Sequence, residues 1–230
     1  MCGRITLTSP AAVIAELFGL AAIPGLEPRY NIAPTQLLAA VRTDQHTGTR
    51  RLDHLRWGLV PYWAKDPAIG NRMINARADS LGDKAAFESA FRKRRCLVVV
   101  SGFYEWQRVG KLAQPYLLRM SDGSPFGLAG LWEVWRNPAG EKLETCAVVT
   151  TDANAVMKAI HDRMPVIVPP EGFAAWLDPA MVDTSKLDPL LRPVECTSLE
   201  AVPVSTYVND PRNEGERCVE PQMVQALLKL

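Results

Sequence analysis

The stretch YLLRMSDGSPFGLAGLWEVWRNPAGEKLETCAVVT, residues 116–150, decides the fold. Its apolar segments are separated by SDGSP and by RNPAGEK, whose Gly, Pro, Asn and Asp residues are typical of tight turns. Short segments rich in Leu, Val, Phe and Trp between such turns favour β-strands, and short connections favour antiparallel pairing. The stretch therefore predicts strands at residues 116–120, 126–135 and 146–150.

The flanking sequence adds further strands and several helices. Apolar segments at residues 37–42, 52–58 and 95–100 predict strands. Helical patterns occur at residues 9–20, with Ser9 as N-cap and an end near Gly19, at 84–94, at 152–162 with Thr151 or Asp152 as cap, at 171–177 and at 220–230. No repeat or Gly/Ser-rich linker divides the chain. We therefore expect one α+β domain over residues 1–230, with a mainly antiparallel, barrel-like β-sheet core flanked by helices.

Composition restricts the function classes. The chain has 230 residues, of which 47% are hydrophobic, as in an ordinary globular protein. Its formal net charge is only +1, so nucleic-acid binding requires a local cluster of Arg and Lys. The cysteines form no CxxC pair, which argues against a disulfide framework or a zinc site. We expect no metal, no cofactor and a monomer. No segment reaches the roughly 18–20 apolar residues of a membrane span, and no signal peptide is recognisable, so a cytoplasmic protein is expected.

The N-terminus MCGRIT carries unusual chemistry. Removal of Met1 makes Cys2 the first residue, which then offers an α-amine and a thiol on adjacent carbons. An internal cysteine cannot provide this pair of nucleophiles. The N-terminus is therefore the first candidate for a reactive site.

Three other segments place polar residues in apolar surroundings. Asn75 lies in RMINARAD, Glu105 in GFYEWQ, and His161 in IHDRMPVIV at the end of a predicted helix. Taken singly, each fits an ordinary structural role: a turn, an edge strand, or a histidine stabilised by a helix dipole. Only their joint occurrence indicates a functional site. The basic run RKRR at residues 92–95 is interpreted as the solvated end of a helix and is left outside the site.

Seven motifs together resemble the SOS response-associated peptidase (SRAP) family. They occur in that family's order and cover nearly the whole chain. They are MCGR (1–4), PRYNIAPTQ (28–36), WGLVPYWA (57–64), INARAD (74–79), GFYEW (102–106), HDRMPVIV (161–168) and PVSTYVN (203–209).

This resemblance implies a DNA-damage protein that joins covalently to abasic sites in single-stranded DNA. It would bind at the nucleoid when the DNA is damaged. The family's catalytic roles would fall on Cys2, Asn75, Glu105 and His161. Its DNA contacts would fall on Arg4, Arg77, Arg163 and the aromatic Trp63, for which core packing is the alternative.

The residue types suit this chemistry. An abasic site equilibrates with an open-chain aldehyde, and an α-amine with a pKa of about 7.7–8.0 has far more free base near neutral pH than a lysine at about 10.4. The Cys2 amine would form an imine, and its thiol would close a thiazolidine. Glu105 would transfer protons, His161 would open the sugar or contact a phosphate, and Asn75 would hold the terminus.

Several points and alternatives stay open at this level. Met1 could leave by autoproteolysis or through a cellular aminopeptidase, and weak lyase activity would follow from β-elimination at the imine. One alternative is an N-terminal-nucleophile amidohydrolase, since amidotransferases also begin Met-Cys-Gly. A second is a cysteine peptidase that uses Cys2, His161 and Asn75. A third is a non-covalent single-strand binder in which Cys2 is incidental.

Overall fold

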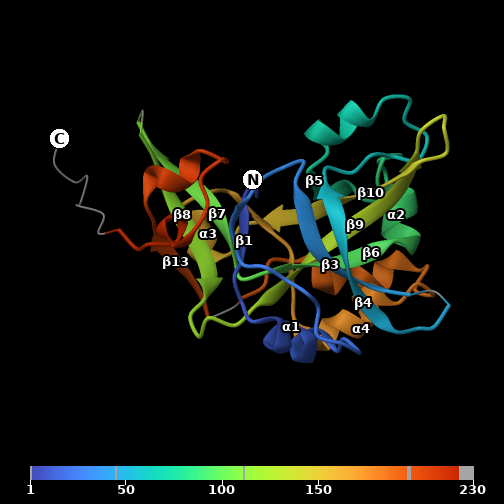
Figure 1. The fold of residues 1–230 in the computed structure, drawn as a ribbon, viewed down its shortest axis with the longest axis horizontal. Helices are drawn as coiled ribbons and strands as arrows, with labels where there is room; N and C mark the ends of the chain where they lie inside the picture. The colour runs from blue at the N-terminus through green and yellow to red at the C-terminus, as the bar shows by residue number, and fades with distance from the viewer. Residues whose placement is uncertain (1, 45, 111, 196–197, 223–230) are drawn as a thin grey trace.

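The protein has an α+β fold built on two β-sheets. The structure, a computed structural model, describes residues 2–44, 46–110, 112–195 and 198–222. Within these residues, a smaller sheet has five strands in the order β13-β8-β7-β1-β2, and a larger sheet has eight. Figure 1 shows the two sheets side by side, with β1 near the centre of the molecule. The predicted α+β class is confirmed.

The elements have the following bounds. The smaller sheet contains β1 (Ile5–Leu7), β2 (Arg29–Ile32), β7 (Gly102–Val109), β8 (Leu112–Met120) and β13 (Leu199–Pro203). The larger sheet contains β3 (Leu37–Thr43), β4 (Arg50–Trp57), β5 (Asn75–Arg77), β6 (Arg95–Val100), β9 (Phe126–Arg136), β10 (Lys142–Asp152), β11 (Arg163–Pro165) and β12 (Ile167–Val168). The α-helices are α1 (Ala11–Phe18), α2 (Glu88–Lys93), α3 (Ala155–Lys158) and α4 (Phe173–Leu177). The 3-10 helices are η1 (Pro67–Arg72), η2 (Ala78–Ser80), η3 (Pro170–Gly172), η4 (Thr184–Leu191), η5 (Thr206–Asn209) and η6 (Glu216–Cys218).

The larger sheet closes on itself. Strand β9 pairs antiparallel with both β6 and β10, β10 pairs parallel with β4, and β4 returns to β6 through β3. The ring β10-β4-β3-β6-β9 is therefore a closed barrel, as the sequence predicted. Residues 116–150 decide this fold because they supply β9 and β10, the two long strands that complete the ring.

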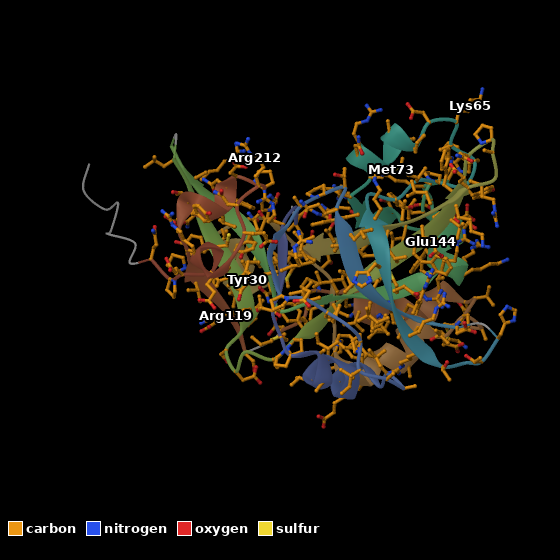
Figure 2. All side chains as sticks on the ribbon, viewed as in Figure 1. Tyr30, Lys65, Met73, Arg119, Glu144 and Arg212 are labelled. Carbon is orange, nitrogen blue, oxygen red and sulfur yellow. The ribbon has the colours of Figure 1, made fainter. Side chains whose placement is uncertain are left out.

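The continuous apolar sequence of β6 reflects burial on both faces. All six residues of β6 are buried. Its outer face is covered by α4, where the Trp176 indole N–H donates to the Cys96 carbonyl across 2.9 Å. Figure 2 shows side chains of both sheets on the ribbon, with Tyr30 and Arg119 on the smaller sheet and Glu144 on the larger one. The continuous apolar sequence of β6 therefore matches a strand that is covered on both sides.

Residues 92–95 differ in part from the expectation of a solvated helix end. Arg92 and Lys93 are exposed, but Arg95 is the first residue of β6 and is only 4% exposed. Its guanidinium donates to the carbonyls of Phe91, Arg92, Trp176 and Asp178. A buried cation is tolerated there because four backbone acceptors surround it.

Two helix starts also differ from the prediction. Pro10 occupies the N-cap position of α1, while the Ser9 hydroxyl contacts the Ser101 hydroxyl at 2.7 Å. Helix α3 begins after Asn154, whose side chain accepts from the Met157 N–H, so neither Thr151 nor Asp152 is the cap. Those two residues belong to β10, because sheet pairing with β11 continues through them.

The end of helix α1 was also predicted. Gly19 ends α1 in the left-handed conformation, as expected. The helix expected at residues 220–230 lies largely outside the described residues.

A close backbone approach places β5 beside the barrel. Gly58 has φ +122°, and a Cβ atom there would lie 2.4 Å from the carbonyl oxygen of Gly70. The chain leaves β4 at Gly58, forms the loop with Trp63 and η1, and returns past Gly58 into β5. Glycine at both crossing points lets the returning chain pack closely enough for β5 to pair with β10.

Candidate active site

Cys2 lies at the junction of the two sheets. It lies three residues before the start of β1, which pairs with β7 through the register Ile5 with Phe103. Its side chain is fully buried, at 0% exposed. Burial raises the pKa of the Cys2 thiol, and the nearby Glu105 carboxylate raises it further, while the backbone N–H of Arg4 acts in the opposite direction. The thiol is therefore held protonated at neutral pH.

Asn75 holds the first residues of the chain from the larger sheet. Strand β5 pairs parallel with β10, with Asn75 opposite Val148. The Asn75 side-chain amide donates to the backbone carbonyl of Cys2 across 2.7 Å. Its Oδ1 atom is buried and has no hydrogen-bond partner among the described residues. A buried acceptor of this kind is suited to a donor that joins the site during a reaction.

Glu105 comes from the smaller sheet and faces the same junction. It lies on β7, opposite Tyr116 of β8, and is only 3% exposed. It is close enough to Cys2 for its carboxylate to affect the thiol pKa. Glu105 also lines a cavity of about 420 Å³ together with Trp106, Arg108, Ile160 and His161. A buried carboxyl group in an open cavity can exchange protons with a bound molecule.

His161 reaches this cavity from the loop between α3 and β11. The sequence predicted His161 at the end of a helix. Helix α3 instead ends at Lys158, so His161 lies beyond the helix. Its Nδ1 atom lies 3.0 Å from the Arg163 backbone N–H and 2.7 Å from an Asp162 carboxylate oxygen. The first contact suits a neutral ring with its proton on Nε2, and the second suits a protonated Nδ1. Both protonation states thus find a partner at Nδ1.

The structure brings all four candidate catalytic residues to the sheet junction. Asn75 contacts Cys2 directly, Glu105 lies within electrostatic range of Cys2, and Glu105 shares its cavity with His161. These residues are up to 159 positions apart in sequence, from Cys2 to His161. Cys2 and Glu105 come from beside β1 and from β7 of the smaller sheet, whereas Asn75 and His161 come from β5 of the larger sheet and from the loop before β11.

The candidate DNA-binding arginines differ in how far they are already engaged. Arg77 is exposed on β5 and pairs with Asp79 at 2.5 Å. Arg163 donates to the carbonyl and hydroxyl of Thr150, each at 2.8 Å. Arg4 is directed inwards and donates to Asn31 and to the Val208 carbonyl. Arg77 therefore offers the most accessible cation of the three.

Trp63 is accessible to a ligand. Its side chain is 50% exposed, so core packing is the wrong explanation for this residue. It lies between β4 and η1 and lines a hollow of about 550 Å³ whose other residues include Lys65, Asn71 and Arg72. An exposed indole beside cations suits the stacking of a nucleic-acid base.

Sequence reasoning missed the cavity walls Trp106, Arg108 and Ile160 and the buried Asn31. Trp106 and Asn31 do stand in the quoted motifs GFYEW and PRYNIAPTQ, so position in a motif was their available signal. Arg108 and Ile160 carry no local signal, because only the packing of the loop after α3 against β7 brings them together, as in the hydrogen bond from the Gln107 side chain to the Ala159 carbonyl.

Comparison with known proteins identifies the family. Residues 1–211 match the family model described as SOS response associated peptidase (SRAP). The chain belongs to the SRAP family. It is 41% identical over 224 residues to the abasic site processing protein YoqW of Bacillus subtilis, a match that covers 96% of this chain and 99% of YoqW. It is 33% identical to the abasic site processing protein HMCES of Xenopus tropicalis, over 84% of this chain and 66% of HMCES.

Solved structures show the same fold for this SRAP chain. A protein from Bacteroides thetaiotaomicron superposes with a TM-score of 0.85 at 24% identity, covering 96% of this chain and 100% of the other. A protein from Bordetella bronchiseptica superposes with a TM-score of 0.76 at 26% identity, covering 89% and 100%. The two-sheet architecture is therefore shared among chains that have diverged widely in sequence.

Two further properties concern the described part of the SRAP chain. None of its helices is both long and apolar enough to cross a membrane. In the same residues, no group of three or more His, Cys, Asp or Glu side chains is arranged to hold a metal ion. The described cysteines Cys2, Cys96, Cys146 and Cys218 are free thiols, and Cys196 lies outside the described residues.

Proposed function

We propose that this SRAP protein processes abasic sites in single-stranded DNA by joining to them covalently through Cys2 after Met1 has been removed. The observation that carries the proposal is the convergence of Cys2, Asn75, Glu105 and His161 at one sheet junction. Relatives named abasic site processing proteins, with up to 41% identity along nearly the whole chain, support the same substrate.

The reaction proceeds in two bond-forming steps. The Cys2 α-amine adds to the C1′ aldehyde of the open-chain sugar, and loss of one water gives an imine. The Cys2 sulfur then adds to the imine carbon while its proton passes to nitrogen, which closes a thiazolidine. Because both nucleophiles belong to one residue, the second step is intramolecular and gains a large effective concentration.

Each neighbouring residue has a defined task. Glu105 takes a proton from the attacking amine and returns one to the departing oxygen, which its position in the cavity allows. His161 assists ring opening of the sugar or contacts the adjacent phosphate. Asn75 holds the Cys2 carbonyl through Nδ2, which leaves its buried Oδ1 to accept a hydrogen from the new α-amine or a sugar hydroxyl.

The state of the Cys2 thiol favours this order of events. A peptidase or amidohydrolase that begins with thiolate attack requires a lowered thiol pKa. Here burial and Glu105 raise the pKa of Cys2. In the proposed reaction the amine attacks first and the thiol adds second, so a protonated thiol is compatible with the mechanism. In addition, Asn75 contacts the Cys2 carbonyl, whereas a papain-like arrangement would use it to orient the histidine.

DNA binding is assigned to the surface around the junction. Arg77 and Arg163 contact phosphates next to the lesion, Arg4 supports the site from within, and Trp63 stacks on a neighbouring base. Because the net charge is only +1, binding depends on this local group of cations. The protein acts as a monomer in this proposal.

Two secondary activities follow from the same chemistry. The imine acidifies the adjacent carbon, so β-elimination of the 3′ phosphate gives weak lyase activity whenever thiazolidine closure is slow. Removal of Met1 is a precondition of the reaction, and the family's name points to autoproteolysis at this bond.

Intact mass spectrometry before and after exposure to a single-stranded oligonucleotide with one abasic site tests the proposal. We expect the purified protein to lack Met1, and the adduct mass to equal the sum of protein and oligonucleotide minus one water. A Cys2→Ala variant should give no such stable adduct. A protein that retains Met1 and still forms the adduct would contradict the mechanism.

Two further assays separate the alternative functions. Release of ammonia from glutamine without any DNA adduct would identify an amidohydrolase. Acetylation of the α-amine with the thiol left free should abolish adduct formation, whereas a cysteine peptidase would keep its activity. DNA binding that does not survive denaturation, in both the parent protein and Cys2→Ala, would identify a non-covalent binder.

A further inference from the structure

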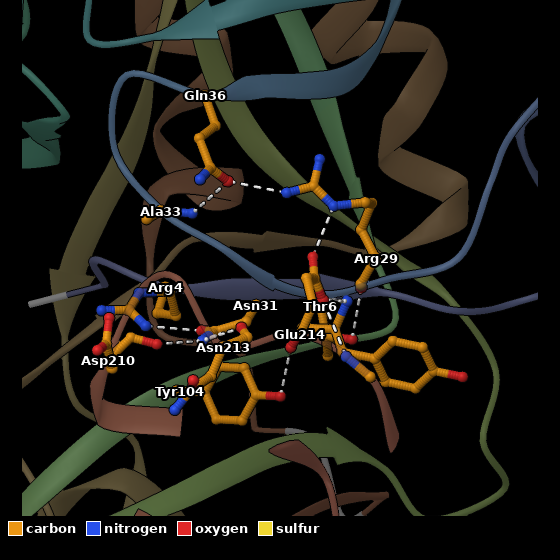
Figure 3. A network of polar contacts seen from close by, with 12 residues as sticks. Arg4, Thr6, Arg29, Asn31, Ala33, Gln36, Tyr104, Asp210, Asn213 and Glu214 are labelled. Carbon is orange, nitrogen blue, oxygen red and sulfur yellow. Dashed lines mark hydrogen bonds and ion pairs between the residues drawn. The ribbon is translucent and has the colours of Figure 1, made fainter. Parts of the chain in front are cut away.

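Two sequence motifs without an assigned role, PRYNIAPTQ and PVSTYVN, meet next to the candidate active site. The meeting point is Asn31 of β2, which is 0% exposed. Its Oδ1 accepts from the Arg4 guanidinium at 2.6 Å, and its Nδ2 donates to the carbonyls of Asp210 at 3.0 Å and Asn213 at 2.9 Å. Figure 3 shows this network, with Arg4, Asn31 and Asn213 close together and joined by dashed lines. One buried amide thus connects the N-terminal segment to residues 205–214, which we name the clamp.

The clamp also holds Arg4 directly. The Arg4 guanidinium donates to the Val208 carbonyl at 2.8 Å. On the other side, the Arg4 carbonyl accepts from the Tyr104 backbone N–H at 2.9 Å, so the residue is fixed by both its side chain and its main chain. Arg4 follows Cys2 by two positions, and its backbone N–H lies near the Cys2 sulfur. The placement of Arg4 therefore determines where Cys2 can lie.

A second contact joins the clamp to the cavity wall. Asn209 accepts a hydrogen bond from the Trp106 indole N–H at 2.7 Å through its Oδ1. Trp106 adjoins Glu105 in sequence and lines the cavity that Glu105 shares with His161. The Arg4 guanidinium lies 5.8 Å from the centre of the Trp106 ring. An indole N–H is only a donor, so one well-placed acceptor is enough to fix the ring orientation.

We propose that the clamp is a positioning element for the covalent reaction: Asn31 sets Arg4 beside Cys2, and Asn209 sets the Trp106 wall of the Glu105 and His161 cavity. This inference rests on the proposed function and extends it to two residues that do not contact the reacting atoms. The clamp should affect the rate of bond formation and not the affinity for DNA. Its contacts are with Arg4, which lies beside Cys2, and with the cavity wall Trp106. The exposed cation Arg77, which is proposed to bind phosphate, pairs with Asp79 instead.

Asn209 provides the cleaner test because it is exposed, so its replacement leaves the core intact. In Asn209→Ala the indole loses its acceptor, and we expect the maximal rate of adduct formation at saturating abasic oligonucleotide to fall about threefold to tenfold. The oligonucleotide concentration at half-maximal rate should stay within about twofold of the parent value. Asn209→Asp keeps an acceptor oxygen and should restore the rate. Thr206→Ala, an exposed change on the same η5 turn, serves as the matched control and should react at the parent rate.

A spectroscopic readout checks the contact itself. In protein labelled with ¹⁵N-tryptophan, the indole resonance that disappears in Trp106→Phe belongs to Trp106. We expect this resonance to shift in Asn209→Ala and to keep nearly its parent position in Thr206→Ala. Trp106→Phe combined with Asn209→Ala should react no more slowly than Trp106→Phe alone, since the hydrogen bond has already been removed.

The outcomes separate the two proposals. Three results would overturn the positioning role while leaving the proposed function intact. They are an Asn209→Ala variant that reacts at the parent rate, an Asn209→Ala variant in which only the oligonucleotide concentration at half-maximal rate changes, and an Asn209→Asp variant that does not restore the rate. Asn31, the buried residue that the clamp contacts, has its own test. Asn31→Ala removes the acceptor for Arg4, and in protein shown to be folded by its thermal unfolding curve it should lower the maximal rate; a parent rate would overturn the Asn31 assignment. If the parent protein forms no adduct, the proposed function fails and this inference fails with it.

Discussion

The Asn75 side-chain amide donates to the Cys2 carbonyl across 2.7 Å, and this bond links the N-terminal segment of the smaller sheet to strand β5 of the larger one. Cys2, the residue proposed to react, is thereby held at the junction of the two sheets, whose buried side chains share one hydrophobic core. The predictions that follow concern this junction, the DNA-binding surface beside it, and the burial that surrounds both.

Replacement of Asn75 should slow the reaction more than it lowers stability. Asn75→Ala removes both the donor to Cys2 and the buried acceptor, and the loss of a partly buried hydrogen bond is worth about 1–3 kcal/mol, or roughly fivefold to 150-fold in rate. Single-turnover kinetics with abasic single-stranded DNA measure this effect. A thermal unfolding curve of the same variant is the control, and a normal rate in a folded Asn75→Ala protein would remove Asn75 from the site.

Glu105→Gln should separate catalysis from binding. The amide retains the size of the carboxyl group but cannot take up a proton, so we expect adduct formation to slow by about 10²-fold or more, which is the usual contribution of a positioned acid or base. Affinity for DNA should change little, because Glu105 is buried and faces the cavity. Fluorescence anisotropy gives the affinity. Equal losses of rate and affinity would indicate that Glu105 supports folding.

Arg77→Ala should weaken binding to all single-stranded DNA to a similar extent and lower the slope of log K against log salt by about one. Arg77 is 54% exposed and close to the site, so a phosphate can replace its Asp79 partner. Arg92→Ala is the matched control, because Arg92 is similarly exposed, at 56%, on α2 and pairs with Glu88. An unchanged salt slope in Arg77→Ala would argue against a phosphate contact.

The buried Cys2 thiol should make stability depend on pH in the alkaline range. Burial raises its folded-state pKa above the unfolded value of about 8.5, so the unfolded chain loses this proton first as the pH rises. The stabilising contribution is therefore present below about pH 8.5 and is lost as the pH rises towards the folded pKa. Urea unfolding at pH 7 to 10 should show a steeper loss of stability for the parent than for Cys2→Ala. Equal slopes would mean that Cys2 is not protected in the folded protein.

Replacement of Arg42, on strand β3, should lower stability and leave the reaction unchanged. It is 3% exposed and pairs with Asp53 at 2.5 Å and with Glu144 at 2.9 Å. Arg42→Met leaves both carboxylates without this partner, and because they are partly solvated we expect a loss of about 2–3 kcal/mol, below the usual range for a fully buried pair. Urea unfolding measures the loss. The adduct rate of the folded variant should equal that of the parent.

The sequence by itself determined most of the strands and the groups proposed to react. Turn residues between apolar segments located β3, β4, β6, β8, β9 and β10, because strand pairing over short connections is a local property. The N-terminal Cys2, with its two nucleophiles, and the motifs around Asn75, Glu105 and His161 were likewise legible in the chain. Helix starts were harder to predict from the sequence. Thr151 and Asp152 are residue types that often cap helices, but here they belong to β10 because they pair with β11.

Only the tertiary structure decided how these groups meet. The closure of the barrel through β9, the crossing at Gly58 and Gly70, and the burial of Cys2 depend on contacts between residues far apart in sequence. The same is true of the clamp, whose Asp210 lies 179 residues from its partner Asn31. Local sequence fixes which chemistry a residue can perform, but long-range packing fixes its distance from its partners and its exposure to solvent, and these two quantities decide whether that chemistry occurs.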